Sequence, residues 1–425
     1  MRILGGYGER VITPPFLGIM AGYDKRKSPA KGVHDDLYVK CLVFKKEEEI
    51  FVLFSLDVLG VDKKLVDEIK TQVKSLVNIP GEHILVCATH THSGPSEIFW
   101  GKDNFNPEYW NFVVSQCKNS FEEALNDLKE SALWYGKKEI YGIGSKRNAY
   151  SAERREEGIK CKFFEVRREK DEIAIVNFPC HLTVLDENNL YYSKDLVQGL
   201  KLELEENKIK KFVFINGAAG DISTRFYKKE STFEEAERLG RVLGKEILGE
   251  RPRMKKIEIN EPKWAKEIEL LLKYKRNLSK EEKERKKAEI LQILAQINDK
   301  RARRDLESAL IVLERPDRDF SKIPEVIKRG EDFLKKIKIS LWKMGDIVFV
   351  GVPFEIYYDT GLKIEKMVKE KYEKAVVLVL GYCGGYEGYI PPSENFSRIS
   401  YEVIASPFEE DAEEEMLEAL RKELN

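Results

Sequence analysis

Five short apolar runs along the chain are each followed at once by residues that can bind a metal ion or a reacting atom. The runs cover residues 84–88, 173–176, 212–215, 347–350 and 376–380. Continuous apolar runs of this length are typical of buried strands in an α/β sheet. Because the ligands of open α/β sheets bind beyond the carboxyl ends of the strands, we predict one site, built from the loops that follow these five runs.

Other segments carry the spacing of amphipathic helices, with apolar residues three to four positions apart. This spacing predicts helices over residues 62–77, 107–129, 195–206, 232–247 and 409–424, with Thr232 as an N-cap. The first 60 residues predict strands over 11–15, 38–44 and 50–57. The alternation indicates an α/β fold of mixed β-sheets with flanking helices and a site at the carboxyl ends of the strands.

Residues 264–336 differ from the rest of the chain because they are dense in Lys, Arg and Glu and contain few glycines. We predict that they form a charged helical insertion within a single domain that spans residues 1–425. A basic arm that binds nucleic acid is the alternative, but Glu281, Glu282, Glu284 and Glu289 dilute its positive charge. We therefore favour a solvated helical face.

The composition narrows the class of protein. The chain has 425 residues, of which 42% are hydrophobic, so it is globular, and its net charge of −1 argues against a broad nucleic-acid surface. No apolar run is long enough to span a membrane, so we expect no stable membrane insertion. The first residues lack the apolar core of a secretory signal, so a complete chain is expected to be cytoplasmic. The six cysteines lack CxxC spacing and are interpreted as buried thiols. The oligomeric state stays open.

Three of the five histidines, His90, His92 and His181, stand just after predicted strands. Neutral imidazole is the commonest nitrogen ligand of zinc. In an extended chain the side chains of His90 and His92 point to the same face, so both can reach one cavity. His181 and Glu355, each from another strand end, complete a set that leaves a position for water. This arrangement is typical of a catalytic zinc.

The other two histidines and Glu355 also have a structural interpretation. His83 follows Gly81 in a turn and is best interpreted as a hydrogen-bonded structural residue. For His34, a polar turn with the neighbouring aspartates is as good an interpretation as a functional one. Glu355 alone is explained equally well as an acid at a helix N-terminus.

The order of several motifs along the chain resembles the neutral (non-lysosomal) ceramidases. The most specific are ATHTHSGP at residues 88–95 and NGAAGDIS at residues 216–223. The others are TPP at 13–15, MAGY at 20–23, GVHDDL at 32–37, SLD at 55–57, RNAY at 147–150, PCHLT at 179–183, SKD at 193–195, PFE at 353–355 and the segment 386–392 followed by Tyr401. The resemblance therefore covers most of the chain.

The resemblance implies a zinc amidase. In that family the metal ligands correspond to His90, His181, Glu355 and Tyr389 of this chain. Tyr386 competes with Tyr389, which is preferred because Tyr401 follows it at the family's spacing of twelve residues. The resemblance further implies that the cleaved amide lies near His92, Arg147 and Ser223.

We expect His92, Arg147 and Tyr401 to donate to the developing oxyanion. Ser223 is expected to act as a nucleophile or to position the substrate, and an ST-turn after Asp221 is its structural interpretation. Asp195 and Asp221 are expected to accept hydrogen bonds from the ligand histidines.

The chain departs from the family at Thr224 and Arg225, where Pro-Asn is usual, at Phe354, where Gly is usual, and in the segment after His34. The immunoglobulin-like domain of full-length ceramidases is not expected. These departures leave the predicted metal site intact and favour a small or amphipathic N-acyl substrate. Three hypotheses follow: a Zn²⁺-dependent amide hydrolase, a metal-dependent esterase or other hydrolase on the same scaffold, and a binding protein with a vestigial metal site.

Overall fold

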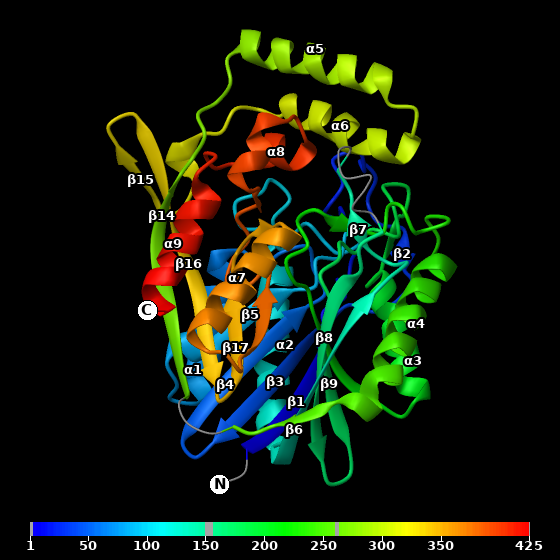
Figure 1. The fold of residues 1–425 in the computed structure, drawn as a ribbon, viewed down its shortest axis with the longest axis vertical. Coiled ribbons are helices and arrows are strands. Elements are labelled where there is room, and N and C mark those ends of the chain that lie inside the picture. Colours follow the sequence, from blue (N-terminus) through cyan, green and yellow to red (C-terminus); the bar gives the residue numbers. More distant parts are fainter. Residues whose placement is uncertain (1–2, 149–155, 260–262, 425) are drawn as a thin grey trace.

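Two β-sheets pack face to face between outer layers of helices (Figure 1). The computed structural model describes residues 3–148, 156–259 and 263–424. One apolar core lies between the sheets and joins residues such as Leu53 and Ile175 of the first sheet to Trp342 and Leu378 of the second. Because successive residues of a strand point to opposite faces, the alternate residues of the same strands form the cores under the helices.

The first sheet is mixed and has the strand order β11-β9-β8-β6-β1-β3-β4-β5, with β13 paired to β6. Two of its neighbouring pairs, β4–β5 and β9–β11, are parallel and the rest are antiparallel. Its strands are β1 (Ile3–Val11), β3 (Tyr38–Lys46), β4 (Glu49–Leu56), β5 (Ile84–Ala88), β6 (Lys129–Ile140), β8 (Ile159–Arg168), β9 (Glu172–Asn177), β11 (Lys211–Ile215) and β13 (Lys255–Ile257).

The second sheet has the order β14-β16-β17-β19, with β15 paired to β16, and its β17–β19 pair is parallel. Its strands are β14 (Lys263–Lys273), β15 (Val326–Arg329), β16 (Asp332–Met344), β17 (Ile347–Gly351) and β19 (Val376–Leu380). Three short pairs lie beyond the strand ends: β2 (Gly32–Val33) with β10 (Tyr191–Tyr192), β7 (Ser145–Lys146) with β12 (Ile222–Ser223), and β18 (Glu355–Ile356) with β20 (Tyr389–Ile390).

The helices cover the outer faces of both sheets. Helices α1 (Lys63–Leu76) and α2 (Pro107–Asn126) pack on one half of the first sheet, and α3 (Leu196–Glu206) and α4 (Phe233–Glu250) on the other half. Helices α7 (Tyr358–Lys371) and α9 (Ala412–Leu424) cover the second sheet. Helices α5 (Lys280–Gln296), α6 (Lys300–Leu313) and α8 (Tyr401–Ala405) lie together at one end of the molecule (Figure 1).

The prediction of a mixed α/β fold is confirmed, and so are the five buried strands. The strand predicted over residues 11–15 is wrong, because β1 ends at Val11 and two prolines that cannot donate to a ladder follow. The glycines of β1 weaken its strand pattern, but they are needed because α2 crosses the strand at this point and leaves no room for side chains. A Cβ on Gly6 would lie 2.0 Å from the Ala124 carbonyl oxygen.

The prediction that residues 264–336 are helical is correct only for the middle of that segment. Its two ends belong to β14, β15 and β16 of the second sheet. In β14 the acids Glu267 and Glu269 alternate with buried Ile268 and form ion pairs with Lys338 and Lys336 across the ladder. A half-buried strand whose exposed residues form cross-strand ion pairs has the same composition as a charged helix, which explains why the helical prediction failed for these strands.

Candidate functional site

The loops that follow the five predicted strands meet at one place. Thr91, after β5, forms a parallel bridge with Leu182, after β9, and His181 forms one with Ser223, after β11. Glu355, after β17, pairs with Tyr389, after β19, in the β18–β20 ladder. These backbone pairings bring the predicted side chains from separate parts of the sequence into one cluster.

His90 and His92 face each other across this cluster, with their Nε2 atoms 3.3 Å apart. Both side chains therefore reach one cluster, but not through an extended chain, because His90 has a φ of 67°. Left-handed backbone is uncommon outside glycine and recurs at sites where the surrounding structure holds it in place. The His90 ring is fixed by stacking on Tyr382, at 4.0 Å between ring centroids.

Backbone carbonyls orient the two histidines that were predicted as metal ligands. His90 Nδ1 lies 2.7 Å from the Leu59 carbonyl oxygen, and His181 Nδ1 lies 2.7 Å from that of Ala219. A carbonyl only accepts, so each Nδ1 carries a proton, and in the neutral imidazole each Nε2 presents a lone pair. These carbonyls take the place of the predicted aspartates.

The prediction that Asp195 and Asp221 accept from histidine N–H groups is wrong. Asp195 accepts from the backbone N–H groups of Leu185 and Leu196, and Asp221 accepts from that of Tyr358. Both carboxylates therefore cap turns and a helix start instead of reaching the imidazoles.

The two bare Nε2 atoms converge on one carboxylate oxygen. Glu355 Oε2 lies 3.4 Å from His90 Nε2 and 3.1 Å from His181 Nε2, and it is buried without a hydrogen-bond donor among the described residues. Three electron-pair donors facing one another repel unless a cation lies between them. In a tetrahedral zinc centre neighbouring donor atoms are about 3.3 Å apart, as follows from bonds of about 2.0–2.1 Å. The donor set fits a divalent ion.

The charge states agree with this arrangement. Burial, reinforced by the charge of Arg147, lowers the pKa of His181 to about 3. Burial and the two neighbouring imidazoles lower the pKa of His92 well below its usual range. Burial alone would raise the pKa of Glu355, but the adjacent imidazoles outweigh it and keep the pKa well below the usual range. The lowered pKa values of His92 and His181 favour neutral imidazoles, and that of Glu355 favours a carboxylate, which are the forms in which these groups bind metals.

The structure separates the two competing tyrosines. The Tyr389 hydroxyl lies 3.2 Å from His181 Nε2, inside the donor cluster. The Tyr386 hydroxyl donates to Glu355 Oε1 at 2.7 Å, the oxygen that points away from the histidines. Tyr389 is therefore placed to contact an ion, whereas Tyr386 is placed to orient the carboxylate.

Arg147 connects the cluster to a buried acid that the sequence did not single out. Its Nη2 donates to the Tyr389 hydroxyl at 2.8 Å, and its Nε donates to Glu402 Oε1 at 2.9 Å. The Tyr401 ring lies edge-on to Tyr389, with 5.6 Å between centroids. Glu402 follows Tyr401 directly at the start of α8, so one short helix supplies both residues. The predicted Arg147 and Tyr401 therefore lie beside the donor cluster.

Ser223 lines the cavity next to the cluster, and its Oγ accepts the Arg225 backbone N–H at 3.3 Å. This bond is the ST-turn that its structural interpretation predicts. The bond uses an acceptor lone pair of Oγ and leaves the hydroxyl proton free, so it fits a nucleophile and a positioning residue equally.

The remaining histidines lie apart from the cluster. His83 stacks on Phe51 and contacts the Ile50 carbonyl through Nδ1, which matches its structural interpretation. His34 pairs with Asp35 and stacks on Phe233, as in a polar turn. Among the residues that the structure describes, the group of acids, cysteines and histidines that is close enough to share an ion is His90, His92 and His181.

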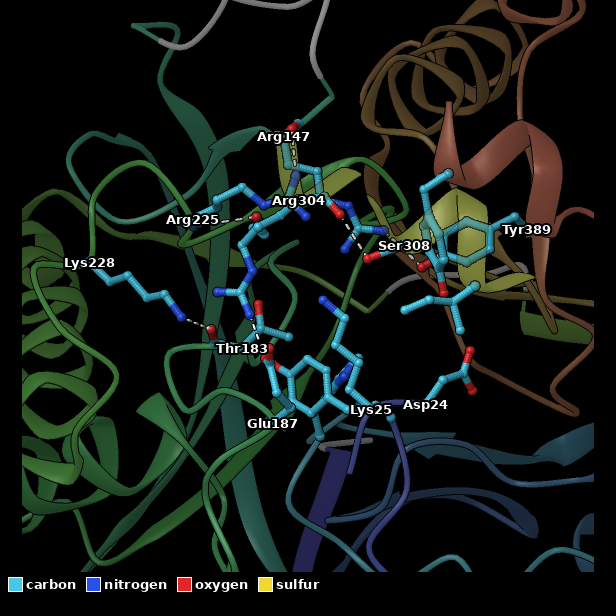
Figure 2. Close-up of a pocket in the computed structure, with 16 residues that line it drawn as sticks. Asp24, Lys25, Arg147, Thr183, Glu187, Arg225, Lys228, Arg304, Ser308 and Tyr389 are labelled. Carbon is cyan, nitrogen blue, oxygen red and sulfur yellow. Dashed lines mark hydrogen bonds and ion pairs between the residues drawn. The ribbon is translucent and has the colours of Figure 1, made fainter. Parts of the chain in front are cut away.

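A cavity of about 120 Å³ opens over the cluster. His92, Arg147, Ser223, Tyr389 and Tyr401 form its inner wall. Figure 2 shows a second group of side chains around the same cavity, and these six are all charged: Asp24, Lys25, Glu187, Arg225, Lys228 and Arg304. No sequence pattern connects these residues with the site, because they come from separate loops and from the charged insertion.

Glycine is required at one point of the cavity wall. Gly22 has a φ of 102°, and a Cβ there would lie 2.5 Å from His92 Nδ1. Both the backbone conformation and the contact with the imidazole therefore exclude a larger residue.

Comparisons with known proteins agree on the class. A solved structure described as "Ceramidase complexed with C2" has a TM-score of 0.75 at 17% identity, covering 100% of this chain and 74% of that chain. The neutral ceramidase from Pseudomonas aeruginosa gives 0.74 at 18%, covering 100% and 75%. At these identities the likeness shows the fold of a ceramidase. No curated protein matches the sequence of this chain.

Residues 4–226 match the family described as "Neutral/alkaline non-lysosomal ceramidase, N-terminal". The chain belongs to this family, and the predicted resemblance is confirmed. Family and fold together support a hydrolase that acts on ceramide-like amides. Of the motifs that carried the resemblance, Ala149 and Tyr150 lie outside the described residues. Within the described residues, no helix is both long and apolar enough to cross a membrane.

Proposed function

We propose that this protein is a zinc-dependent hydrolase that cleaves the amide bond of an N-acyl substrate. The observation that carries the proposal is the convergence of His90 Nε2 and His181 Nε2 on the unpartnered Oε2 of Glu355. These three atoms, with the Tyr389 hydroxyl, would hold the ion. A divalent ion bound there would supply a Lewis acid that polarises a carbonyl and acidifies water.

The residues around the cavity are suited to the rest of the chemistry. Arg147 places a permanent positive charge next to the Tyr389 hydroxyl, where an amide carbonyl that becomes an oxyanion is stabilised. His92 presents Nε2 toward the cluster, and its Nδ1 has no hydrogen-bond partner among the described residues, so its ring can hold or release a proton. Tyr401 and Ser223 line the same cavity and can orient the scissile group.

Removal of one histidine tests the proposal. His181→Ala removes one of the Nε2 donors, so the purified protein is expected to lose most of its bound metal and its amidase activity. His83→Ala, which removes a histidine of the same type outside the cluster, is the matched control and keeps both. Metal is measured by inductively coupled plasma mass spectrometry, and activity on a panel of N-acyl amines and p-nitrophenyl esters.

The panel separates the competing hypotheses. Cleavage of the esters alone would replace the amidase by an esterase, since a metal-activated water attacks both kinds of carbonyl. A wild-type protein that contains no metal and cleaves neither would favour a binding protein. A His181→Ala protein with full metal content and full activity would remove the basis of the proposed site.

We also propose that residues 1–425 form one catalytic domain in which α5 and α6 are an insertion. Both helices lie in the connection between β14 and β15 of the second sheet. Arg304 on α6 forms an ion pair with Glu187, and Ile399 near α8 packs in the small core between the two helices. These contacts attach the insertion to the body of the domain at the mouth of the cavity.

A further inference from the structure

The cavity over the candidate metal cluster is lined by more positive than negative side chains. Five cationic residues contribute to its wall, against two acids; the cations are Lys25, Arg147, Arg225, Lys228 and Arg304, and the acids are Asp24 and Glu187. Figure 2 shows them arranged around one opening. The chain as a whole has a net charge of −1, so this local excess is not a property of the composition.

Ion pairs account for only part of this charge. Glu187 is paired with Arg304, and Asp24 with Arg315 outside the cavity wall. Arg147 is paired with Glu402, which lies behind it. The two acids of the wall are thus already neutralised.

Arg225 has one long ion pair, and Lys228 has no carboxylate at ion-pair distance among the described residues. The Arg225 Nη1 donates to the Arg147 carbonyl oxygen at 3.0 Å, and its nearest carboxylate oxygen is Asp305 Oδ1 at 3.9 Å. The Lys228 Nζ donates to the carbonyl oxygens of Thr183 and Val184, at 2.9 and 2.8 Å. Carbonyl oxygens hold both side chains in place; the charge of Arg225 is only partly compensated, and that of Lys228 has no ion-pair partner among the described residues.

The burial of these two cations is reflected in their pKa values, which are both lowered. Burial, followed by the charge of Arg304, lowers the pKa of Lys228 to about 8. Burial also lowers the pKa of Arg225; the charge of Asp305 opposes this shift, and the charge of Arg147 adds to it. Cations that repel one another in a partly dry cavity are stabilised when an anion binds between them.

The same wall offers little to a long hydrocarbon chain. Ile311 supplies the aliphatic part of the cavity wall, and the other apolar surface comes from Tyr23, Tyr389 and Tyr401. The cavity of about 120 Å³ is small beside the 300–1,000 Å³ typical of pockets that take drug-sized ligands.

We infer that the substrate is a short N-acyl amide that carries an anionic group, a carboxylate or a phosphate, which Arg225 and Lys228 bind. The inference rests on the proposed amidase function for the position of the amide. The charged insertion takes part in this recognition. Arg304, Ser308 and Ile311 stand three to four residues apart on α6 and present one face of that helix to the cavity.

Isosteric ketones test the inference without turnover. In 4-oxopentanoate a CH₂ replaces the amide N–H of N-acetylglycine, so it cannot be hydrolysed. Calorimetric titration of the purified protein with its metal compares this probe with 4-oxopentyl phosphate and with the neutral 4-oxopentanamide. We expect at least one of the two anions to bind ten or more times more tightly than the neutral probe, and the tighter one identifies the anionic group.

Three variants assign the preference to the cavity wall. Lys228→Met and Arg225→Gln are each expected to weaken binding of the preferred anion about tenfold and to leave that of the neutral probe unchanged. Lys229→Met, at the next position but outside the cavity wall, is the matched control and behaves as the wild type. Equal binding of all three probes would overturn the inference. A preference for anions that both wall variants retain would also overturn it, because that result is expected when the anion binds only the metal.

Kinetics distinguish failure of this inference from failure of the proposed function. N-acetylglycine and N-acetylglycinamide differ only in charge at the far end from the acyl group. Cleavage of both with equal kcat/KM would leave the amidase in place and contradict the anionic substrate. Selective binding of the anions by a protein that cleaves no amide would support the anion site and contradict the amidase.

Discussion

Asn216 and Cys180 exchange two hydrogen bonds between the loops that follow β11 and β9. The Asn216 Oδ1 accepts the Cys180 backbone N–H at 3.1 Å, and the Asn216 Nδ2 donates to the Cys180 carbonyl at 2.9 Å. The same Nδ2 donates to the Thr89 carbonyl at 3.0 Å. His90 follows Thr89 and His181 follows Cys180, so one buried amide sets the spacing of two candidate metal ligands.

Asn216→Ala is expected to lower both stability and metal affinity. The substitution leaves buried backbone groups of Cys180 and Thr89 without partners, at about 1–3 kcal/mol for each group that water does not reach. Groups that orient the ligands typically change metal affinity by about 10–100-fold when removed. Urea unfolding and competition with a chelator measure the two effects. The exposed Asn188→Ala is the control, and a variant with wild-type metal affinity would show that the loops hold their spacing without Asn216.

Tyr389→Phe is expected to weaken metal binding more than Tyr386→Phe. The first substitution removes an oxygen that lies 3.2 Å from His181 Nε2, whereas the second removes one hydrogen bond to Glu355 Oε1. We expect a loss of at least about tenfold in metal affinity for the first variant and a smaller loss for the second. Competition with a chelator gives both values in the same assay. The reverse order would identify Tyr386 as the ligand.

The parts of the fold that the sequence predicts are those set by local pattern. The five central strands are continuous apolar runs because both of their faces are buried, one between the sheets and one under helices. His90, His181 and Glu355 follow three of those strands, and ligands of open α/β sheets bind beyond the carboxyl ends of strands, so the sequence predicts that these donor atoms lie together.

The parts that the sequence does not predict depend on distant partners. Arg147 and Glu402 are 255 positions apart, and nothing near either residue indicates the other. The Lys and Glu residues of β14 are explained only by β16, the strand with which β14 pairs. Arg304 belongs to a segment with the composition of a solvated helix, yet one face of α6 forms part of the cavity wall. That segment is therefore solvent-facing only in part.

Substitution of Glu402 is expected to reduce activity through Arg147. Glu402→Gln leaves the buried guanidinium without its carboxylate, which typically costs about 3–5 kcal/mol of stability. Because Arg147 then holds the Tyr389 hydroxyl less firmly, we expect kcat to fall about tenfold while metal content is retained. Arg147→Met is expected to lose about 100-fold, as for removal of an oxyanion donor.

A double-mutant cycle on Arg147 and Glu402 separates a positioning acid from an independent catalytic group. If Glu402 acts only through Arg147, the double variant has the kcat of Arg147→Met alone. Additive losses in the double variant would contradict this relationship and give Glu402 a separate contribution to the reaction. Urea unfolding of the same four proteins reports the stability of the pair independently of activity.

Lys40 gives the protein a pH dependence of stability that is separate from the candidate site. Its amine is buried over the Phe212 ring, 3.1 Å from the centroid. Burial lowers its pKa to about 7, against the opposing charges of Asp57 and Glu9 and in the same direction as those of Lys194 and Lys201. Between about pH 7 and the ordinary lysine pKa of about 10.4, the unfolded chain therefore binds more protons at this position than the folded chain.

Stability should accordingly rise with pH over that range, by at most about 1.4 kcal/mol per unit from this group. Lys40→Met removes the dependence, so we expect the variant to be more stable than the wild type at pH 7 and the difference to shrink toward pH 10. Urea unfolding at intervals of half a pH unit measures both curves. The exposed Lys25→Met is the control for loss of a charge in general. A Lys40→Met protein that is less stable than the wild type at pH 7, with an unchanged slope, would show that the buried amine is compensated by its acidic neighbours.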